Sequence, residues 1–439
     1  MNERRDVYIV DGSRTPQLKA RGKPGPFSAS DLAVSAGRAL LMRHDFDLGT
    51  LDEVIIGCVM PSEDEANIGR VIALRLGVPQ TVPAWTVQRN CASGMQSIDS
   101  AFHNIANGQS DLVLAGGVEA MSRAPLLYNR AMVDWMAELM QAKTFGQKLK
   151  IFTRFRPGHL KPVISLLRGL TDPVVGLNMG QTAENIAANF GITRRQMDSF
   201  AVDSHIRLAA AHEAGYLDEI EPVYDSGGKH YDHDDGVRPD SSIEKLAKLR
   251  PVFDRKYGNV TAGNSAQITD GATLLLLASE EAVEKHGLPV LARIVDSQWA
   301  GLDPAVMGMG PVHAMTPIMQ RHQFAIEDID YWEINEAFAT QVLGCIEAWK
   351  DDDYCRTNLG IETAFGEIPH QRLNVDGGGV SIGHPVGASG ARIVLHLAKV
   401  LQRNNARRGM ASLCIGGGQG GAMLIENVSK ALSASEVAS

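Results

Sequence analysis

The sequence predicts an α/β protein assembled from a duplicated half-domain, with a further segment inserted between the two copies. Short apolar runs of strand length, such as Val7 to Val10 and Val54 to Cys58, alternate with helical patterns such as Asp31 to Leu41. One arrangement of helix and buried strand also occurs twice along the 439 residues. We therefore expect two related halves that meet at a shared centre.

The first copy begins at Cys91-Ala92-Ser93-Gly94. Apolar residues then recur with helical spacing at Met95, Ile98, Phe102 and Ile105. Gly108 and a strand-like run from Asp111 to Gly117 follow. This order predicts a helix whose first turn lies next to Cys91, followed by a buried strand.

The second copy begins at Gly387-Ala388-Ser389-Gly390 and repeats that order. A helical pattern covers Ile393 to Leu401, and a basic turn leads to the strand-like run from Met410 to Gly416. Each copy is expected to direct a helix N-terminus toward the shared centre.

A long stretch of irregular composition, about Ser122 to Val260, separates the copies and predicts an inserted loop domain. The expected division is therefore an N-terminal half of residues 1–121 and 261–285, a loop domain of residues 122–260, and a C-terminal half of residues 286–439.

Part of the insert, Gln141 to Thr171, is basic although the whole chain has a net charge of -9. It contains no acidic residue and carries Lys143, Lys148, Lys150, Arg154, Arg156, Lys161 and Arg168. Apolar residues are interleaved with these cations, as in segments that bind a membrane surface or a partner protein. The equally weighted alternative is an ordinary solvated basic face over a phosphate site.

The bulk composition argues for a soluble protein of the cytoplasm. The negative net charge disfavours nucleic acid as a partner. Five scattered cysteines are typical of a reducing compartment, and none of them shows zinc-ligand spacing. No secretion signal is visible, and the longest apolar runs, such as Leu274 to Ala278, are far shorter than the roughly 20 residues of a membrane span.

Cys91 is the strongest candidate for a nucleophile. Its thiol would meet the first free amides of a helix, whose partial positive charge lowers a thiol pKa. An isolated cysteine is more often a small buried hydrophobe. The small residues Ala92, Ser93 and Gly94, which would let a substrate approach the backbone, favour the catalytic interpretation.

Two further candidates come from the second copy. His384, in Gly383-His384-Pro385, precedes the second helix, where the duplication would place it across the centre from Cys91 as the base that such a thiol needs. Cys414 ends the second strand beside glycines whose amides could stabilise an oxyanion. A second thiol there could exchange a proton with carbon.

Asn335 lies between an apolar run, Tyr331 to Ile334, and a helical pattern. Its uncharged amide suits holding a water molecule or polarising a carbonyl. A helix cap is the common alternative use of Asn at such a position.

Two other motifs predict different functions and fail on chain order or context. Gly379 to Gly383 matches the G-x-S-x-G elbow of hydrolases, but no acid and histidine follow Ser381 in the order that class requires. Gly416 to Gly421 matches G-x-G-x-x-G, but the next residues are typical of a strand and not of the helix that a dinucleotide site needs.

Taken together, the chain resembles the thiolase family nearly from end to end. The family's four motifs have counterparts in Cys91-Ala92-Ser93, Asn335-Glu336-Ala337-Phe338, Gly383-His384-Pro385 and Cys414-Ile415-Gly416. The resemblance implies two βαβαβ-type halves in a layered α-β-α-β-α core, a homodimer or homotetramer, and CoA as a substrate with no permanently bound cofactor and no metal. Ketoacyl synthases share this fold but use a second His where this chain has Cys414.

The resemblance also implies roles for single residues. Cys91 would attack the 3-keto carbon, with His384 taking the thiol proton and Cys414 protonating the departing acetyl-CoA carbanion. Asn335 would act in one oxyanion hole through a water with His384, and the amides of Cys91 and Gly416 would form the other. Contacts with substrate are expected from three residues, Met179, Ser265 and Phe338.

The implied reaction is thiolytic cleavage of 3-ketoacyl-CoA to acetyl-CoA and a shortened acyl-CoA. Asn178 and Ala266 stand where many short-chain biosynthetic thiolases have His and Ser. With the basic insert 141–171, these changes look more like the β-subunits of fatty-acid oxidation complexes, whose insert meets a membrane or an α-subunit. The alternatives are a biosynthetic acetoacetyl-CoA thiolase and a non-catalytic lipid-binding protein of the same fold.

Overall fold

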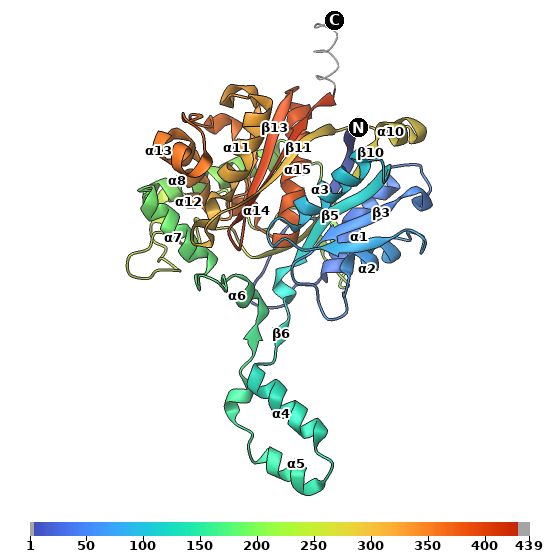
Figure 1. Ribbon diagram of the computed structural model, residues 1–439, viewed down its shortest axis with the longest axis vertical. Helices are drawn as coiled ribbons and strands as arrows, with labels where there is room; N and C mark the ends of the chain where they lie inside the picture. Colours follow the sequence, from blue (N-terminus) through green and yellow to red (C-terminus); the bar gives the residue numbers. More distant parts are fainter. Residues whose placement is uncertain (1–3, 429–439) are drawn as a thin grey trace, which may run out of the picture.

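A computed structural model describes residues 4–428, and its main feature is one ten-stranded mixed sheet (Figure 1). The strands follow the order β12-β13-β14-β11-β1-β10-β5-β3-β4, and the short β2 pairs with β10. Their bounds are β1 Val7–Arg14, β2 Leu18–Lys19, β3 Glu53–Gly57, β4 Ala84–Val87, β5 Leu112–Ala120, β10 Thr269–Ser279, β11 Ala292–Gly301, β12 Tyr331–Ile334, β13 Arg408–Ile415 and β14 Gln419–Glu426.

The two halves of this sheet repeat the same strand order and directions, which confirms the predicted duplication. In the first half, β5 is parallel to β3 and antiparallel to β10, and β10 is antiparallel to β1. In the second half, β13, β12, β14 and β11 are related in the same way. The halves join where Val7–Ile9 of β1 pairs with Ala292–Ile294 of β11.

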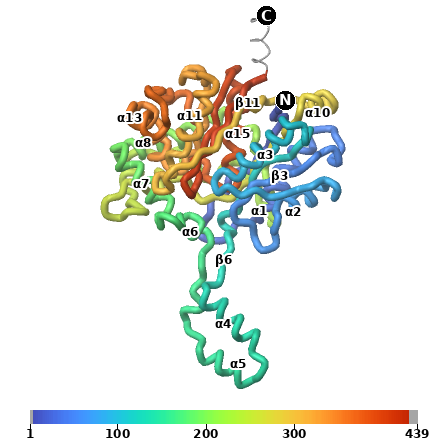
Figure 2. Tube along the Cα trace, viewed as in Figure 1, coloured from blue at the N-terminus to red at the C-terminus, as the bar shows by residue number. Residues whose placement is uncertain are grey.

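Helices lie on both faces of each half and produce the expected layers (Figure 2). Two helices lie between the halves, α3 (Ser93–Ala106) and α15 (Val386–Arg403), and pack on each other. Outside them, α1 (Ala29–Met42) and α2 (Ile68–Arg75) cover the first half, and α11 (Gly310–His322) covers the second. The remaining helices of the two halves are α10 (Glu280–His286), α12 (Ala339–Lys350), α13 (Asp352–Tyr354) and α14 (Gly379–Ile382).

The alternation of side chains along β5 shows why both faces are apolar. Leu112 and Leu114 belong to the core under α1, whereas Val113 and Ala115 belong to the central core with α3 and α15. Because successive side chains of a strand point to opposite faces, a strand between two helical layers needs an unbroken apolar run. The layered α/β class predicted from the sequence is confirmed.

The glycines of the repeated A-S-G pattern serve the contact between α3 and α15. A side chain at Gly94 would begin 2.8 Å from the carbonyl oxygen of Gly387, and one at Gly390 would begin 2.6 Å from the amide of Met95. These glycines therefore let the two helix starts cross closely. The expectation that their small size admits substrate to the backbone is not what their surroundings show.

The inserted segment contains most of the remaining elements, and α7 and α8 pack against α12 of the second half. Its bounds are β6 Leu126–Leu127, α4 Arg130–Gln141, α5 Phe145–Phe152, β7 Val163–Ile164, α6 Ser165–Gly169, α7 Met179–Asn189, α8 Arg194–Glu213, β8 Val223–Tyr224, β9 His230–Tyr231 and α9 Ile243–Leu246.

Residues 126–164, here called the arm, project from the body of the molecule (Figures 1 and 2). The antiparallel pair β6 and β7 forms its stalk, and α4 and α5 form its tip. Trp135 packs edge-on against Phe152 and Phe155 and donates a 3.0 Å hydrogen bond to the carbonyl of Ile151. None of the helices among residues 4–428 combines the length and apolar character needed to span a membrane.

Candidate active site

Cys91 lies in a tight loop between β4 and α3. Ala92 is the residue before the first turn of α3, so the sequence placed Cys91 correctly beside a helix start. The Ser93 hydroxyl accepts a 2.9 Å hydrogen bond from the amide of Arg89 and donates one of 2.7 Å to the carbonyl of Asn90. Both bonds close the loop around Cys91, so Ser93 sets its backbone path.

The thiol of Cys91 faces two backbone amides, its own and that of Gly416. Burial raises the pKa of the Cys91 thiol, the two amides lower it, and the charge of Glu119 adds to the rise. Burial outweighs the amides, so the net direction is upward and the predicted lowering of the pKa is wrong for the free protein. A low-dielectric site penalises a thiolate unless a base removes the proton as the reaction proceeds.

Cys414 is near the end of β13, as predicted, and is almost fully buried. Burial raises the pKa of its thiol well above the ordinary value, and the nearby Cys91 contributes in the same direction. Cys414 comes two residues before Gly416, which lines the same cavity as Cys91, although the two cysteines belong to different halves. A thiol that keeps its proton is suited to act as an acid toward a carbanion.

His384 is buried, and its ring is oriented by Ser389 of the second A-S-G pattern. Nδ1 lies 2.6 Å from the Ser389 hydroxyl, which also donates a 3.1 Å hydrogen bond to the carbonyl of Pro385. Because that hydroxyl proton is committed to Pro385, we assign the hydrogen in the shorter contact to Nδ1 of the histidine. Nε2, which has no hydrogen-bond partner among the described residues, then carries the lone pair.

Burial lowers the pKa of His384 to about 4, and the positive charge of Arg392 contributes in the same direction. The imidazole is therefore neutral near pH 7 and can accept a proton. The nitrogen of the Asn335 amide lies 3.4 Å from Nδ1 of His384, and the oxygen of that amide is buried without a partner among the described residues.

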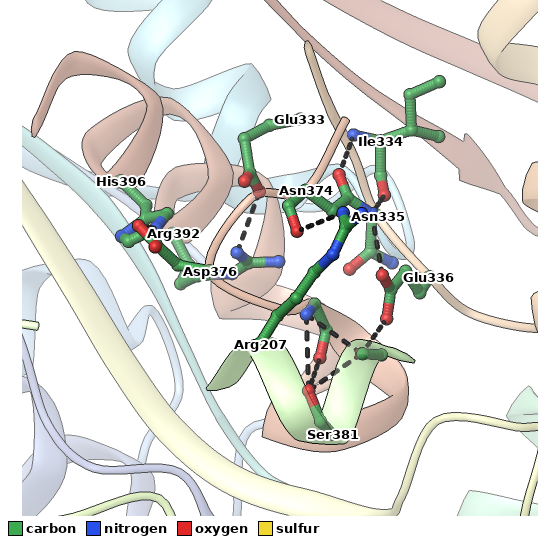
Figure 3. A network of polar contacts seen from close by, with 12 residues as sticks. Arg207, Glu333, Ile334, Asn335, Glu336, Asn374, Asp376, Ser381, Arg392 and His396 are labelled. Carbon is green, nitrogen blue, oxygen red and sulfur yellow. Dashed lines mark hydrogen bonds and ion pairs between the residues drawn. The ribbon is translucent and has the colours of Figure 1, made fainter. Parts of the chain in front are cut away.

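A buried polar network determines the direction of Asn335 (Figure 3). The side chain of Asn374 pairs with the backbone amide and carbonyl of Ile334, at 2.9 Å each, and donates a 2.8 Å bond to the carboxylate of Glu336. Asn374 thus holds both residues that flank Asn335, Ile334 and Glu336. The residue before α12 is Phe338, so Asn335 does not cap that helix.

Cys91 opens into a cavity of about 250 Å³. Its apolar walls come from both halves and from α6, and consist of Val59, Met60, Met121, Leu166, Leu170, Met179 and Val386. The polar lining is supplied by Gln88, Asn90, Ser165 and Gly416 together with Cys91. Small-molecule sites are usually apolar cavities with a few convergent polar groups, and this cavity has that form.

Of the three residues predicted to contact substrate, only Met179 lines this cavity. Met179 lies against Gly416 and lines the cavity. Ser265 and Phe338 pair through an isolated β-bridge, and the hydroxyl of Ser265 donates a 2.7 Å bond to the carbonyl of Thr261. Neither is among the lining residues of this cavity. Their predicted role in binding substrate stays a prediction.

The G-x-S-x-G and G-x-G-x-x-G stretches lie in structural settings that do not suit a hydrolase or a dinucleotide site. Ser381 is fully buried and bonded to Gly378 and Ser204, so it is no exposed hydrolase nucleophile. Residues 419–426 form β14 and not a helix, which excludes the dinucleotide interpretation. Among residues 4–428, no three His, Cys, Asp or Glu side chains converge to hold a metal ion.

Glu119 is a site residue that the sequence analysis missed. Its buried carboxylate accepts hydrogen bonds from the amides of Val59 and Met60, at 2.9 Å each, and from Gly387 at 3.1 Å. Burial raises the pKa of Glu119 to about 7. It thereby ties the cavity wall to the start of α15. The only sequence signal was an acid at the end of an apolar run, which does not predict three amide partners.

Comparison with known proteins defines the class. The model described as "Thiolase, N-terminal domain" matches residues 7–281, and "Thiolase, C-terminal domain" matches residues 288–427. The chain belongs to the thiolase family of acyltransferases.

Individual relatives span the chain. A β-ketoadipyl-CoA thiolase from Pseudomonas aeruginosa is 40% identical, covering 97% of this chain and 100% of its own length. The mitochondrial trifunctional enzyme subunit beta of Bos taurus is 35% identical, covering 96% and 88%. The crystal structure of human mitochondrial 3-ketoacyl-CoA thiolase in complex with CoA matches with a TM-score of 0.82 and 36% identity, covering 97% and 98%.

Proposed function

We propose that this protein cleaves 3-ketoacyl-CoA with CoA, in the degradative direction of fatty-acid β-oxidation, through a thioester on Cys91. The observation that carries the proposal is the placement of Cys91. Its thiol faces the amides of Gly416 and of its own residue and opens into an apolar cavity, with the thiol of Cys414 in the same centre.

In the first half-reaction, the sulfur of Cys91 attacks the 3-keto carbon while the neutral His384 accepts the thiol proton. The amide of Asn335, acting through a water with His384, stabilises the oxyanion. The bond between C2 and C3 then breaks. Cys414 gives its proton to the carbanion of the departing acetyl-CoA, and the shortened acyl chain stays on Cys91.

In the second half-reaction, a CoA thiol attacks the thioester and returns a proton to Cys414. The amides of Cys91 and Gly416 stabilise the oxyanion of this step. Acyl-CoA leaves, and the sulfur of Cys91 regains its proton from His384. All groups then return to their starting protonation states, so one CoA is consumed for each acetyl-CoA released.

A preference for longer acyl chains is part of the proposal. The side chain of Asn178 caps α7, because its oxygen accepts a 3.0 Å hydrogen bond from the amide of Gln181. The cavity wall is apolar and is completed by Leu166 and Leu170, from α6 and the residue after it. Apolar walls bind methylene groups with a gain of about 0.8 kcal/mol for each CH₂ buried.

The test is thiolysis of 3-ketoacyl-CoA from four to sixteen carbons, with 3-ketoadipyl-CoA as a competitor and mass spectrometry of the Cys91 peptide. Rising kcat/KM with chain length and an acyl adduct on Cys91 are expected. Activity on acetoacetyl-CoA alone would move the protein to the biosynthetic class. Preference for the dicarboxylic substrate would replace the β-oxidation assignment, and no adduct would contradict the mechanism.

A homodimer or homotetramer in the cytoplasm completes the proposal. The edge strand β4 has a free side in the described part of the chain, and its Trp85 is partly exposed. Such an edge is suited to pair with a second copy. Five free cysteines support a reducing compartment.

The arm is the proposed docking element, and its occupant is the surface of an anionic membrane. Each helix of its tip exposes an apolar stripe with helical spacing: Val133, Met136 and Met140 on α4, and Phe145, Leu149 and Phe152 on α5. The arm carries seven Lys and Arg residues against two acids, both of which are paired with arginines. Apolar stripes beside unpaired cations match the chemistry of anionic lipid headgroups.

The position of the arm supports one of the two interpretations of residues 141–171. Lys143 to Lys161 lie on the projecting part, away from the body (Figure 1). Ser165, Leu166, Gly169 and Leu170 line the cavity of Cys91. The basic residues at the tip therefore do not cover the active-site cavity, which favours docking over a phosphate site.

A further inference from the structure

Asn90, the residue before Cys91, has a backbone conformation that few side chains tolerate. Its φ is 43°, in the left-handed region. Asn is among the few residues other than glycine that adopt this region readily, because its short amide bonds locally. The conformation turns the chain so that Cys91 follows directly after a reversal and precedes α3.

The side chain of Asn90 contacts the opposite catalytic loop. Its Nδ2 donates a 2.8 Å hydrogen bond to the carbonyl oxygen of Gly416, which is 326 residues away in the chain. The amide of the same Gly416 faces the sulfur of Cys91. Asn90 therefore holds the carbonyl group of Gly416, and the amide of that same residue faces the sulfur of Cys91.

The loop that Asn90 contacts, Gly416 to Gly418, is a three-residue connection between the paired residues Ile415 of β13 and Gln419 of β14. Gly417 and Gly418 follow with φ of 92° and 75°, and glycine has more conformational freedom than any other residue. The carbonyl of Gly418 accepts a 2.8 Å bond from the amide of Leu302, which anchors the far end. Asn90 supplies the corresponding anchor at the end next to Cys91.

We propose that Asn90 is a positioning residue that locks the Gly416 amide onto the sulfur of Cys91 across the two halves of the fold. The lock stabilises the Cys91 thiolate and keeps the amide in place for the oxyanion of the second half-reaction. This inference deepens the proposed thioester mechanism and rests on it. It assigns to Asn90 a role through Gly416 and not a contact with the reacting atoms.

The test separates the hydrogen bond from the backbone conformation. Asn90→Gly removes the bond and permits the same φ, whereas Asn90→Ala removes the bond and also disfavours that φ. A lost hydrogen bond of this type corresponds to roughly a two- to tenfold effect. We expect kcat of Asn90→Gly to fall about tenfold, with KM nearly unchanged, and Asn90→Ala to fall further.

Alkylation of Cys91 by iodoacetamide against pH, followed on the Cys91 peptide without any acyl-CoA, supplies a second readout. In Asn90→Gly the apparent pKa of Cys91 should rise, because the Gly416 amide is no longer held toward the sulfur. The thermal unfolding midpoint should fall only slightly in that variant, because a single hydrogen bond is lost. A structural role alone would shift the midpoint without shifting the pKa.

Wild-type kcat and a wild-type alkylation profile in Asn90→Gly would overturn the inference, even if Asn90→Ala is impaired, because conformation alone would then explain the residue. Failure of the proposed function is distinguishable. It would appear as absence of thiolysis and of an acyl adduct in the wild-type protein, whereas the alkylation profiles would still report whether Asn90 acts on Cys91.

Discussion

Apolar residues are buried in the centre of the fold and exposed on the arm. In the centre, the start of α15 is packed so closely on β5 that a single methyl group at Gly387 would lie 2.3 Å from the carbonyl oxygen of Val118. On the arm, Met140 and Phe145 leave 85% and 82% of their surface exposed. Hydrophobic burial therefore explains the first region and cannot explain the second.

We expect this difference in burial to correspond to two different functions of the centre and the arm. The centre holds the thiols, the imidazole and the amides at determined positions, which chemistry at a carbonyl requires. The arm contributes no residue to that set, and its exposed apolar area favours contact with another surface. Changes in the centre should alter turnover or folding, and changes on the arm should alter association only.

The largest effect is expected from Cys91→Ala. Removal of the nucleophile should lower kcat by about 10⁴-fold or more, because no other group can hold the acyl chain. The fold should persist, since the change removes one sulfur atom. Steady-state thiolysis and mass spectrometry of the Cys91 peptide measure this, and a labelled thioester retained in the variant would refute the assignment.

A matched pair of glycine substitutions contrasts packing in the two regions. Gly387→Ala should destabilise the protein by about 3 kcal/mol or more, because the new methyl group meets backbone atoms that cannot move aside. Gly146→Ala, in α5 of the arm, meets open space and should cause no loss. Urea unfolding measures both, and equal stabilities would contradict the close packing of α15 on β5.

The stability of the centre should also depend on pH, through a buried histidine. His396 of α15 lies between the carboxylates of Glu219 and Asp376, at 3.1 and 3.0 Å. Although burial lowers it, these charges raise the pKa of His396 to about 10. The folded state thus binds this proton more tightly than the unfolded chain, whose pKa is about 6.5.

The stabilisation from His396 is fully present below pH 6.5 and is lost as pH rises through about 10. The free energy of unfolding should therefore fall between these values. His396→Gln should flatten that slope, and urea titrations at several pH values measure it. Equal slopes in the variant and the wild type would exclude His396 as the cause.

The smallest effect concerns the arm. Replacing Met140 and Phe145 with Glu should weaken co-sedimentation with anionic vesicles by about tenfold or more, because each loses apolar contact and adds like charge. Thiolysis of short substrates should not change. Met42→Glu is the control, since Met42 is also exposed but lies at the end of α1. Equal binding to neutral and anionic vesicles would contradict the proposed occupant.

The sequence by itself determined the duplicated α/β plan and the positions of Cys91 and Cys414 beside their helix and strand. Hydrophobic periodicity and internal repetition are visible along the chain, because the side chains that will be buried recur at the spacing of a helix or a strand. It also separated Ser381 and the glycines of β14 from the motifs that they imitate, because chain order and local structure exclude both.

Only the tertiary structure decided the electrostatic balance and the cross-half contacts. The direction of the Cys91 pKa depends on burial beneath residues far along the chain, and that burial opposes the helix amides that the sequence showed. The bonds from Asn90 to Gly416 and from Gly387 to Glu119 join residues 326 and 268 positions apart in the chain. A pattern of neighbours along the chain cannot contain such contacts, because folding alone brings their partners together.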